Sequence, residues 1–349
     1  MSLNREELLA ALKLAEPALA SKGPNPAWNN YLFSEVAVLA FDDLLAIKVP
    51  YKSGLSGCLP GASLLGVLSS SGATELEVLS MEGSVLKAKL GRSKLELPMG
   101  KTADFKFEEP KIQGAKAVPL TADLLGGLAK VSVALGWDSL QPWSFGVTLA
   151  PAKGGLQLLA TNNFSMARVV VAEKFTLEEA ALLPPRFVES LLRHTKRDPA
   201  VRLYVWEAGD WVAASFESGA VMYCRTSPQA DPTKYEEVLA GLMSGELLPI
   251  PKSLDGSLGR ARVFLTSPVV SERVALFRVS KDRLHVEVGT DRGSLRDVHK
   301  FPGHADVSIK APPELILAAL PHTERLGFVP DRAVRMQGPG FDYVISGAV

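Results

Sequence analysis

The residues that could do chemistry in this chain are few and do not form a known catalytic pattern. His299 and His304 lie five residues apart, with Asp297 and Asp306 nearby. This grouping could seed a metal site, but it has no HExxH pattern and no third ligand at a typical spacing. Charged loop residues around a turn are the simpler interpretation. The sequence therefore predicts no metal site.

Other reactive groups are equally isolated along the chain. No G-x-S-x-G, P-loop or G-x-G-x-x-G motif occurs. The acidic pairs Asp42-Asp43 and Glu108-Glu109 lack a partner set for acid–base catalysis. The two cysteines, Cys58 and Cys224, have no CxxC spacing, which argues against a disulfide framework or structural zinc and favours a reducing compartment. We expect no catalytic residue and no cofactor.

The composition describes an ordinary globular chain without a charge bias. Of 349 residues, 47% are hydrophobic and 22% are charged, and 38 Lys plus Arg balance 38 Asp plus Glu. A chain of this length suggests two or three domains. Neutrality gives no general attraction to nucleic acid but leaves a local basic surface open. The N-terminus contains charges and a proline, and no apolar window approaches a membrane span, so we expect an intracellular protein.

Three short segments share one pattern, in which a proline precedes apolar residues at helical spacing. Proline is favoured at a helix start, where its missing N–H costs nothing. The three prolines, Pro60, Pro184 and Pro312, lie 124 and 128 residues apart. A second set of helices, starting at Leu8, Leu124 and Leu254, precedes them, with apolar residues at i, i+4, i+7 and i+11.

Between these helices lie runs with strand-like alternation, bounded by Gly, Asp, Ser or Asn. Each repeat reads as helix, about three strands, helix, about three strands, which predicts an α+β fold with helices on one face of antiparallel sheet. The predicted domains are 1–113, 114–241 and 242–349. Residues 158–171, LLATNNFSMARVVV, are expected to form two strands joined by a turn at Asn162-Asn163. The alternative is three unrelated α+β modules that share helix starts.

The order and spacing of several segments resemble the bacterial-type DNA polymerase III beta sliding clamp. The matching segments are LLAALKLAEPAL, LSGCLPGASLLGVLSS, GRSKLELPM, LLATNNFSMA, TKYEEVL and FDYVISGAV. The chain departs from the family pattern at residues 162–165, at Glu236 and Glu237, and at Ser346-Gly347, as in a divergent clamp, with phage-encoded clamps among the candidates. The resemblance implies three similar clamp domains, each with two helices backed by antiparallel sheet, and two chains closing a six-domain ring.

This resemblance also implies a function without catalysis. A clamp tethers the replicative polymerase by encircling double-stranded DNA, and it must contact phosphates without reading bases. We expect a homodimer in the cytoplasm, associated with the nucleoid, that binds DNA polymerase and the clamp loader through short peptide motifs. The predicted DNA-facing residues are Lys13, Lys22, Lys130, Arg186, Arg193, Lys196, Arg197, Lys252, Arg260 and Arg262. For each of them, a solvated helix face is the alternative.

Two further surfaces follow from the resemblance. A hydrophobic cleft for partner peptides, between the second and third domains, would include Thr161, Phe164, Met166, Val238, Leu239, Val344, Ile345 and Ser346. The ring would close where an edge strand of domain one meets domain three of the other chain, through Arg92, Lys94, Leu95, Leu97, Val263 and Phe264. The alternatives are ordinary core for the cleft residues and a local hairpin for the edge strand.

Two other functions stay open at this point. One is a monomeric protein-binding module that keeps the clamp fold without encircling DNA. The other, from a different class, is a hydrolase whose site leaves no motif. Molecular mass separates the first from a ring, since a dimer has about twice the 37.4 kDa of one chain.

Overall fold

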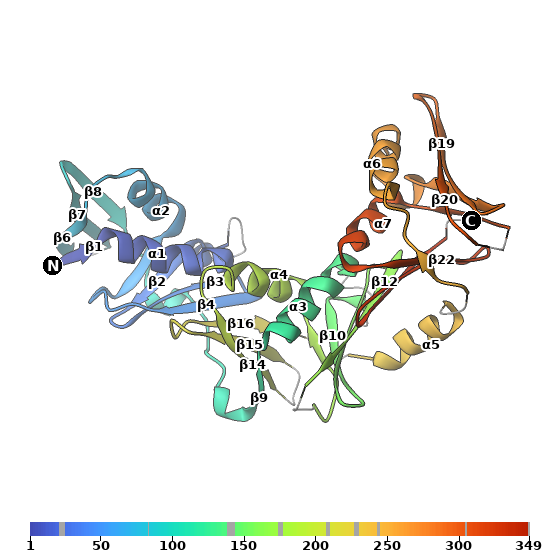
Figure 1. Ribbon diagram of the computed structural model, residues 1–349. Helices are drawn as coiled ribbons and strands as arrows, with labels where there is room; N and C mark the ends of the chain where they lie inside the picture. The colour runs from blue at the N-terminus through green and yellow to red at the C-terminus, as the bar shows by residue number, and fades with distance from the viewer. Residues whose placement is uncertain are drawn as a thin grey trace. The chain divides into compact units, whose positions relative to one another are not determined.

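The computed structural model describes residues 1–20, 25–82, 84–137, 144–173, 177–206, 210–226, 230–242, 245–303 and 306–347. Within these ranges the chain is α+β, and all strand pairing is antiparallel (Figure 1). None of the helices in these ranges is long and apolar enough to cross a membrane. The predicted fold class, three clamp-like repeats of helices and antiparallel sheet, is confirmed.

The same order of elements occurs three times: a strand, a helix, four strands, a second helix and three strands. The first repeat consists of β1 (Ser2–Asn4), α1 (Arg5–Ala15), β2 (Asn30–Ser34), β3 (Ala37–Phe41), β4 (Leu45–Pro50), β5 (Gly57–Pro60), α2 (Gly61–Ser70), β6 (Glu75–Glu82), β7 (Val85–Leu90) and β8 (Ser93–Pro98). The second consists of β9 (Ala115–Pro119), α3 (Ala122–Val131), β10 (Val147–Ala152), β11 (Gly155–Thr161), β12 (Ser165–Ala172), β13 (Ala181–Leu183), α4 (Pro185–His194), β14 (Ala200–Trp206), β15 (Trp211–Phe216) and β16 (Val221–Arg225).

The third repeat follows a separate helix, α5 (Pro232–Leu242). It consists of β17 (Leu248–Pro249), α6 (Leu254–Phe264), β18 (Ala275–Ser280), β19 (Arg283–Thr290), β20 (Gly293–Lys300), β21 (Val307–Ala311), α7 (Pro313–Ala319), β22 (Arg325–Val329), β23 (Ala333–Gly338) and β24 (Phe341–Ser346). The expectation of about three strands between the helices missed β5, β13 and β20. Of these, β5 and β13 are short and end just before proline-led helices, where proline dominates the local pattern.

The strands assemble within two compact units, each with one long and one short sheet. Unit 1 contains Met1–Leu120 and Glu189–Thr226, and unit 2 contains Thr121–Val188 and Ser227–Val349. The long sheets have the orders β5-β2-β3-β4-β16-β15-β14-β9 in unit 1 and β13-β10-β11-β12-β24-β23-β22-β17 in unit 2. The short sheets are β1-β6-β7-β8 and β20-β19-β18-β21. Each long sheet joins strands of two repeats, so these units differ from the predicted sequence domains, whose boundaries stay a prediction.

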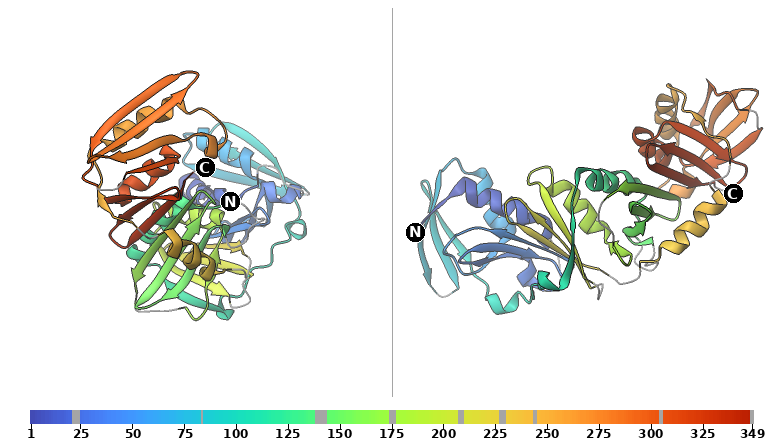
Figure 2. Two further views of the ribbon diagram at one scale, coloured as in Figure 1. Left: turned by 90° about the vertical axis from the view of Figure 1, so that its right-hand side faces the viewer. Right: turned by 60° about the horizontal axis from the view of Figure 1, so that its bottom comes forward.

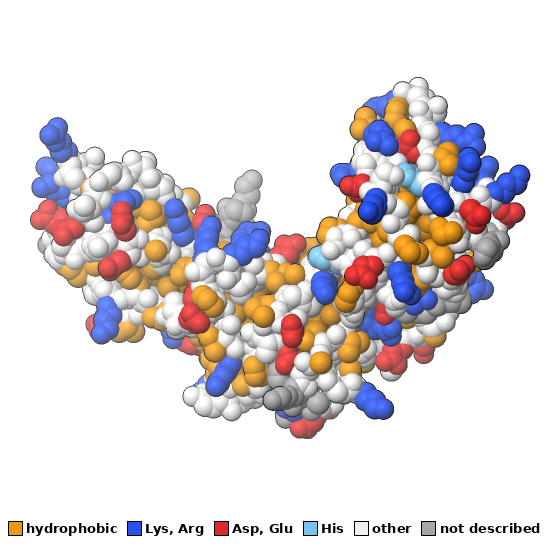
Figure 3. Space-filling view, in the orientation of Figure 1, with side chains coloured by type: hydrophobic (Ala, Val, Ile, Leu, Met, Phe, Trp, Pro, Cys, Tyr) orange, Lys and Arg blue, Asp and Glu red, His pale blue; other side chains and the backbone are white. Residues whose placement is uncertain are grey.

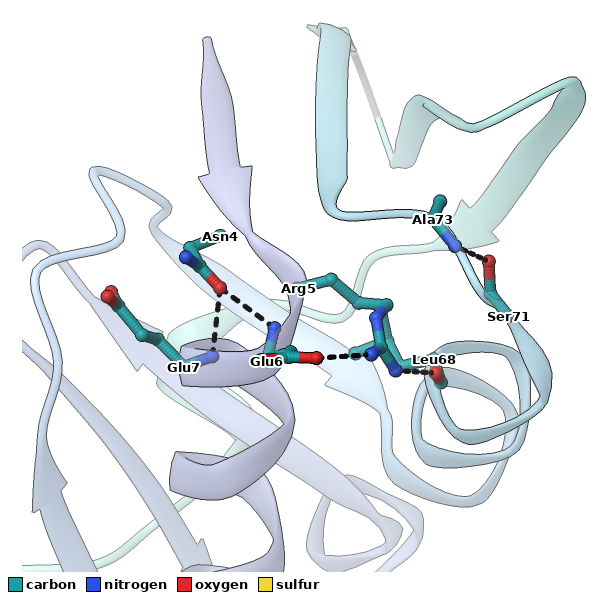
Figure 4. Close-up of polar contacts among 7 residues, drawn as sticks. All are labelled: Asn4, Arg5, Glu6, Glu7, Leu68, Ser71 and Ala73. Atoms are coloured by element: carbon teal, nitrogen blue, oxygen red, sulfur yellow. Dashed lines mark hydrogen bonds and ion pairs between the residues drawn. The ribbon is translucent and has the colours of Figure 1, made fainter.

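In unit 1, α1 and α2 pack together and contact strands of both sheets. The predicted apolar stripe of α1 is buried, with Leu8, Leu12 and Ala15 fully covered. The helix begins after Asn4, whose side-chain oxygen accepts hydrogen bonds from the backbone N–H groups of the next turn (Figure 4). Arg5 donates from Nη1 to the backbone oxygen of Leu68, 3.0 Å away, and so fastens α1 to the last turn of α2.

The first helix is shorter than its apolar pattern predicted. The pattern reaches Leu19, but α1 ends at Ala15 and a 3₁₀ turn covers Glu16–Ala18. Pro17 lies in that turn, and a proline cannot donate the backbone hydrogen bond that continues an α-helix. The apolar residues beyond it are therefore positioned by the turn and not by the helix.

In unit 2, α6 and α7 also pack together, and α6 contacts β19 and β20 while α7 contacts β24 (Figure 2). The predicted stripe of α6 is buried at Leu254, Leu258 and Ala261. Another helix of this unit, α3, packs on β11 and β12. Its buried face includes Gly127, where an added Cβ would lie 2.6 Å from Cδ1 of Leu158.

Replacement of two adjacent glycines in α3 should have opposite effects. Gly127→Leu should lower the free energy of unfolding by about 1–3 kcal/mol, because the added side chain collides with the buried strands. Gly126→Leu should raise it by about 0.5–1 kcal/mol, since that position is exposed with nothing within 4 Å and leucine is the better helix former. Urea unfolding monitored by circular dichroism measures both. Equal effects of the two substitutions would contradict the packing of α3 on β11 and β12.

Candidate functional sites

The junction where β12 of the second repeat pairs with β24 of the third contains most of the predicted cleft residues. Thr161 ends β11, and a tight turn at Asn162 and Asn163 leads into β12, as predicted. Asn163 has a φ of 70°, a conformation that asparagine tolerates better than most residues. The Asn162 side-chain oxygen accepts hydrogen bonds from the N–H groups of Phe164 (3.1 Å) and Ser165 (2.8 Å).

The turn is held against the end of the chain by backbone pairing. Ser165 pairs with Ile345 and Met166 pairs with Val344 across the two strands. The Ser346 N–H then donates to the Phe164 carbonyl oxygen at 2.9 Å. Residues far apart in sequence are therefore brought together, as the prediction of a shared cleft requires.

Burial divides the predicted cleft residues into two groups. Thr161, Met166, Leu239, Val344 and Ile345 are all at least 95% buried. Met166, Leu239 and Val344 belong to one core cluster, to which α5 contributes Leu239. The surface available to a partner is consequently smaller than the predicted set, because the buried side chains support it from beneath.

The exposed members of the set lie on three different elements. Phe164 in the turn is 38% exposed, Val238 on α5 is 42% exposed, and Ser346 at the end of β24 is also exposed. Sequence reasoning missed the ion pair between Arg168 and Asp342, whose side chains approach to 2.6 Å across the same strand pair. A separation of 174 residues leaves no local pattern that could have revealed it.

The predicted DNA-facing residues occupy helices and the segments next to them. Lys13 lies on α1, Arg186 and Arg193 on α4, and Arg260 and Arg262 on α6. Five of the set are exposed and make no ion pair or side-chain hydrogen bond among the described residues. They are Lys13, Arg193, Lys196, Lys252 and Arg262. These five cations can meet phosphate oxygens without first breaking a contact.

Other members of that set are less available. Arg260 donates to Asp297 at 2.8 Å, so part of its charge is already balanced. Lys130 and Arg186 are only partly exposed, whereas Arg197 is exposed and lies close enough to His194 to act on its charge. Lys22 lies outside the described residues.

The predicted ring-closing residues lie on or next to two elements, the edge strand β8 and the helix α6. β8 is the outer strand of its sheet and carries Lys94, Leu95 and Leu97, while Arg92 precedes it. Leu97 is 4% exposed and points into its own unit, whereas Leu95 is half-buried. On α6, Val263 is 71% exposed, which makes it the strongest apolar candidate for contact with another chain.

Phe264 faces a different direction from Val263. Its ring packs close to Gly293 at the start of β20, the outer strand of the other short sheet. Basic side chains gather over β19 and β20 in Figure 3. Exposed Arg292, Arg296 and Lys300 contribute to this charge. Arg296 pairs with Glu287 at 3.2 Å, and β8 also carries Glu96, so neither of these two strands is purely basic.

The described histidine and cysteine side chains make the following contacts. Within the described ranges, no three His, Cys, Asp or Glu side chains gather as metal ligands, and His304 lies outside those ranges. The hydroxyls of Ser253 and Ser257 each lie 2.9 Å from a ring nitrogen of His299. This ring links α6 to β20, and both its nitrogens are occupied. Burial raises the pKa of the Cys58 thiol to about 11, with help from Asp104, so the thiol stays protonated.

Buried His194 at the end of α4 lies in the segment that carries several predicted DNA-facing residues. Burial lowers its pKa, while Asp198, 3.7 Å from Nε2, acts in the opposite direction. The unfolded chain therefore takes up the proton more readily than the folded chain. This difference stabilises the folded chain above the ordinary histidine value of 6.5, and the stability is lost as pH falls below it.

A pH series tests this assignment. The free energy of unfolding should fall between pH 7.5 and about 5.5 in the native chain, and His194→Gln should reduce that fall because it removes the titrating group. Asp198→Asn should steepen the fall, since it removes the carboxylate that favours protonation. Urea unfolding at the two pH values measures the slopes. Identical slopes in all three proteins would contradict the assignment.

The chain resembles known proteins in its structure and not in its sequence. No protein-family model matches the sequence, and no curated protein matches it. Among solved structures, the chain is similar to the DNA polymerase III beta subunit from Thermotoga maritima, with 19% identity and a TM-score of 0.82 over 99% of this chain and 98% of that one. It is also similar to the beta chain from Streptococcus pneumoniae, with 14% identity and a TM-score of 0.84 over 100% and 99%.

A third similar structure is the DnaN sliding clamp from Bartonella birtlesii bound to griselimycin. Its sequence is 14% identical, and the TM-score is 0.86 over 100% of this chain and 99% of that one. The agreement extends through all three repeats, because both chains are covered almost completely in each comparison. The protein therefore has the three-domain fold of the DNA polymerase III beta sliding clamps from one end to the other.

Proposed function

We propose that this protein is a DNA polymerase processivity factor, a sliding clamp that encircles duplex DNA as a homodimeric ring. The observation that supports the proposal most strongly is full-length agreement with sliding clamps at TM-scores of 0.80–0.86. A fold that matched only one repeat would fit many binding modules. The proposed role needs no catalytic residue and no cofactor.

The contact with DNA is proposed to be weak and independent of sequence. The five uncommitted cations, on or next to α1, α4 and α6, can pair with phosphate oxygens without base readout. Each phosphate contact releases counterions, so the affinity should fall steeply with salt. Phosphate contacts carry no sequence information, so they allow a bound protein to slide along the duplex.

We place partner docking at the β12–β24 junction. Phe164 and Val238 offer exposed apolar side chains close in sequence to the buried Met166 and Leu239. Short peptide motifs of DNA polymerase and the clamp loader are the proposed occupants, since an apolar surface over a supported core suits a peptide anchor. The proposed location in the cell is the cytoplasm, in association with the nucleoid.

A monomeric clamp-fold protein-binding module is the second candidate. The observation in its favour is that exposed cations lie on both sides of the proposed contact, Arg92 and Lys94 on one and Arg262, next to Val263, on the other. Like charges repel across an interface, although salt screens them within about 10 Å at 0.1 M. The native mass in solution, about 75 kDa for a dimer of 37.4 kDa chains, separates the two candidates.

The topological mechanism predicts that circular DNA retains the protein and linear DNA releases it. A clamp loaded on a nicked circle should stay bound during gel filtration and should leave once the circle is cut, because it slides off an end. Val263→Lys should abolish retention and give a 37.4 kDa species, since it adds a positive charge to a proposed interface that already holds Arg92 and Lys94. Val36→Lys, at a 60% exposed valine, is the matched control. Equal retention on both DNA forms would rule out the ring.

The docking proposal predicts a localised effect of one side chain. Phe164→Ala should weaken binding of a C-terminal polymerase peptide by about tenfold, equivalent to about 1.4 kcal/mol. Val170→Ala, which truncates another exposed residue of β12, should leave the affinity unchanged. Fluorescence anisotropy with the labelled peptide provides the measurement. Unchanged binding by Phe164→Ala would place the docking surface elsewhere.

A further inference from the structure

The turn that forms the β12–β24 junction has a counterpart in unit 1, where β4 of the first repeat pairs with β16 of the second. Asp42 takes the place of the asparagine, and its side-chain oxygen accepts from the N–H groups of Leu44 (3.1 Å) and Leu45 (2.8 Å). Asp43 has a φ of 83°. The Arg225 N–H donates to the Leu44 carbonyl oxygen at 2.8 Å. The acidic pair Asp42-Asp43 therefore forms the turn of a second junction with the same backbone arrangement.

The strand registers identify which side chains correspond at the two junctions. The register of β15 and β16 places Trp211 opposite Arg225, the final residue of β16, and the register of β23 and β24 places Ala333 opposite Ser346, the final residue of β24. On the neighbouring strands, Trp206 follows Val205, which pairs with Val212, and Val329 pairs with Ala333. Two tryptophans at the β4–β16 junction thus replace a valine and an alanine at the β12–β24 junction.

The segments that cover the two junctions also differ. At the β12–β24 junction, α5 inserts Tyr235 and Leu239 and completes a buried cluster. At the β4–β16 junction, the segment after β8 inserts Phe105, which is 1% exposed, into a buried cluster. Phe107 of the same segment packs against that cluster. The tryptophan rings and Phe107 remain partly exposed above this cluster. Unit 1 consequently keeps an open aromatic surface where the other junction is filled.

This aromatic surface lines a cavity of about 1230 Å³ that lies wholly within unit 1. Phe107 and Trp211 meet edge to face, with ring centroids 6.1 Å apart. The guanidinium carbon of Arg225 lies 5.4 Å from the centroid of the Trp211 ring. Trp206 lines the same cavity. The geometry provides an aromatic pocket for an apolar anchor with a cation at its rim.

The charges around the cavity indicate what can lie beside such an anchor. Glu109 is occupied, because Lys48 Nζ lies 2.6 Å away and the Tyr223 hydroxyl donates to it at 2.7 Å. Arg225 is held only loosely by Asp43, at 3.9 Å between half-exposed side chains. A ligand carboxylate at the rim can therefore pair with Arg225 at little cost.

Further charged residues narrow the chemistry of the ligand. Lys106 and Lys111 add positive charge to the lining, and Glu108 and Asp210 add negative charge. A polyphosphate backbone bears a negative charge at every residue and would meet these carboxylates, whereas a short acidic peptide can direct its few carboxylates to the cations and its apolar side chains and amide groups to the rest of the lining. The mixed lining thus favours a peptide over a nucleic acid strand.

We propose that the β4–β16 junction is a second docking site, which binds a short acidic peptide segment of a partner protein. An aromatic or large aliphatic side chain of the peptide packs against Trp206 and Trp211, and a neighbouring carboxylate pairs with Arg225. The choice of a peptide as ligand rests on the docking function proposed for the β12–β24 junction. The site itself is independent of ring formation.

Tryptophan residues allow this site to be observed separately. The chain contains five tryptophans. After fluorotryptophan labelling of the full chain, fluorine NMR resonances are assigned with single Trp→Phe variants. The probes are the peptides acetyl-Asp-Leu-Phe-Asp-amide and acetyl-Lys-Leu-Phe-Lys-amide. The acidic peptide should shift the Trp206 and Trp211 resonances saturably. The basic peptide should bind at least about tenfold more weakly.

Two arginine variants test the role of the rim cation. Arg225→Ala should lower the affinity for the acidic peptide by about tenfold, because a charge-assisted hydrogen bond is lost. Arg202→Ala removes an exposed arginine of the same sheet that lies outside the cavity. This variant should bind the acidic peptide with the affinity of the native chain. Equal affinity for both peptides, or no effect of Arg225→Ala, would overturn the proposal.

The remaining outcomes separate this site from the other junction and from nucleic acid. Phe164→Ala should leave the Trp206 and Trp211 shifts intact, since that residue belongs to unit 2. If polymerase peptides fail to bind at Phe164 while these shifts persist, the function proposed for the β12–β24 junction fails and the present site stands. Shifts caused by oligothymidine and not by the acidic peptide would overturn the peptide assignment in favour of single-stranded nucleic acid.

Discussion

Antiparallel pairing between strands of successive repeats is the interaction on which the rest of this structure depends. β4 pairs with β16, and β12 pairs with β24, so each long sheet runs without a break from one repeat into the next. An unpaired central strand edge would leave backbone groups without partners, and pairing with the next repeat satisfies them. The helices and the covering segments take their positions from these two continuous sheets.

The two junctions show how one backbone arrangement supports different surfaces. Asp42 and Asn162 make the same pair of turn hydrogen bonds, at equal distances. At one junction α5 buries its apolar side chains over small residues, and at the other two tryptophans remain partly exposed. The backbone geometry is thus common to both, while side-chain volume and the covering segment decide whether a core or a cavity results.

Much of the fold was predictable because helical stripes and turn residues are local signals. The stripes through Leu8, Leu124 and Leu254 and the turn at Asn162-Asn163 all appear in the structure. Local patterns also account for the wrong predictions. The apolar spacing of the first helix continues across Pro17, where the helix has already ended, and short strands before proline-led helices contain too few residues to show an alternating pattern. The cleft residues were harder, because apolar type alone does not distinguish a groove surface such as Phe164 from the core beneath it.

The sequence by itself determined the repeat, its helices and its turns, since spacing, capping and proline act within a few residues of one another. Only the tertiary structure decided which strands of different repeats pair and which side chains stay exposed. Arg168 meets Asp342, and Trp211 meets Arg225 and Phe107, through contacts that no local pattern encodes. The physical reason is that strand pairing brings distant segments together, and burial is settled by what then covers them.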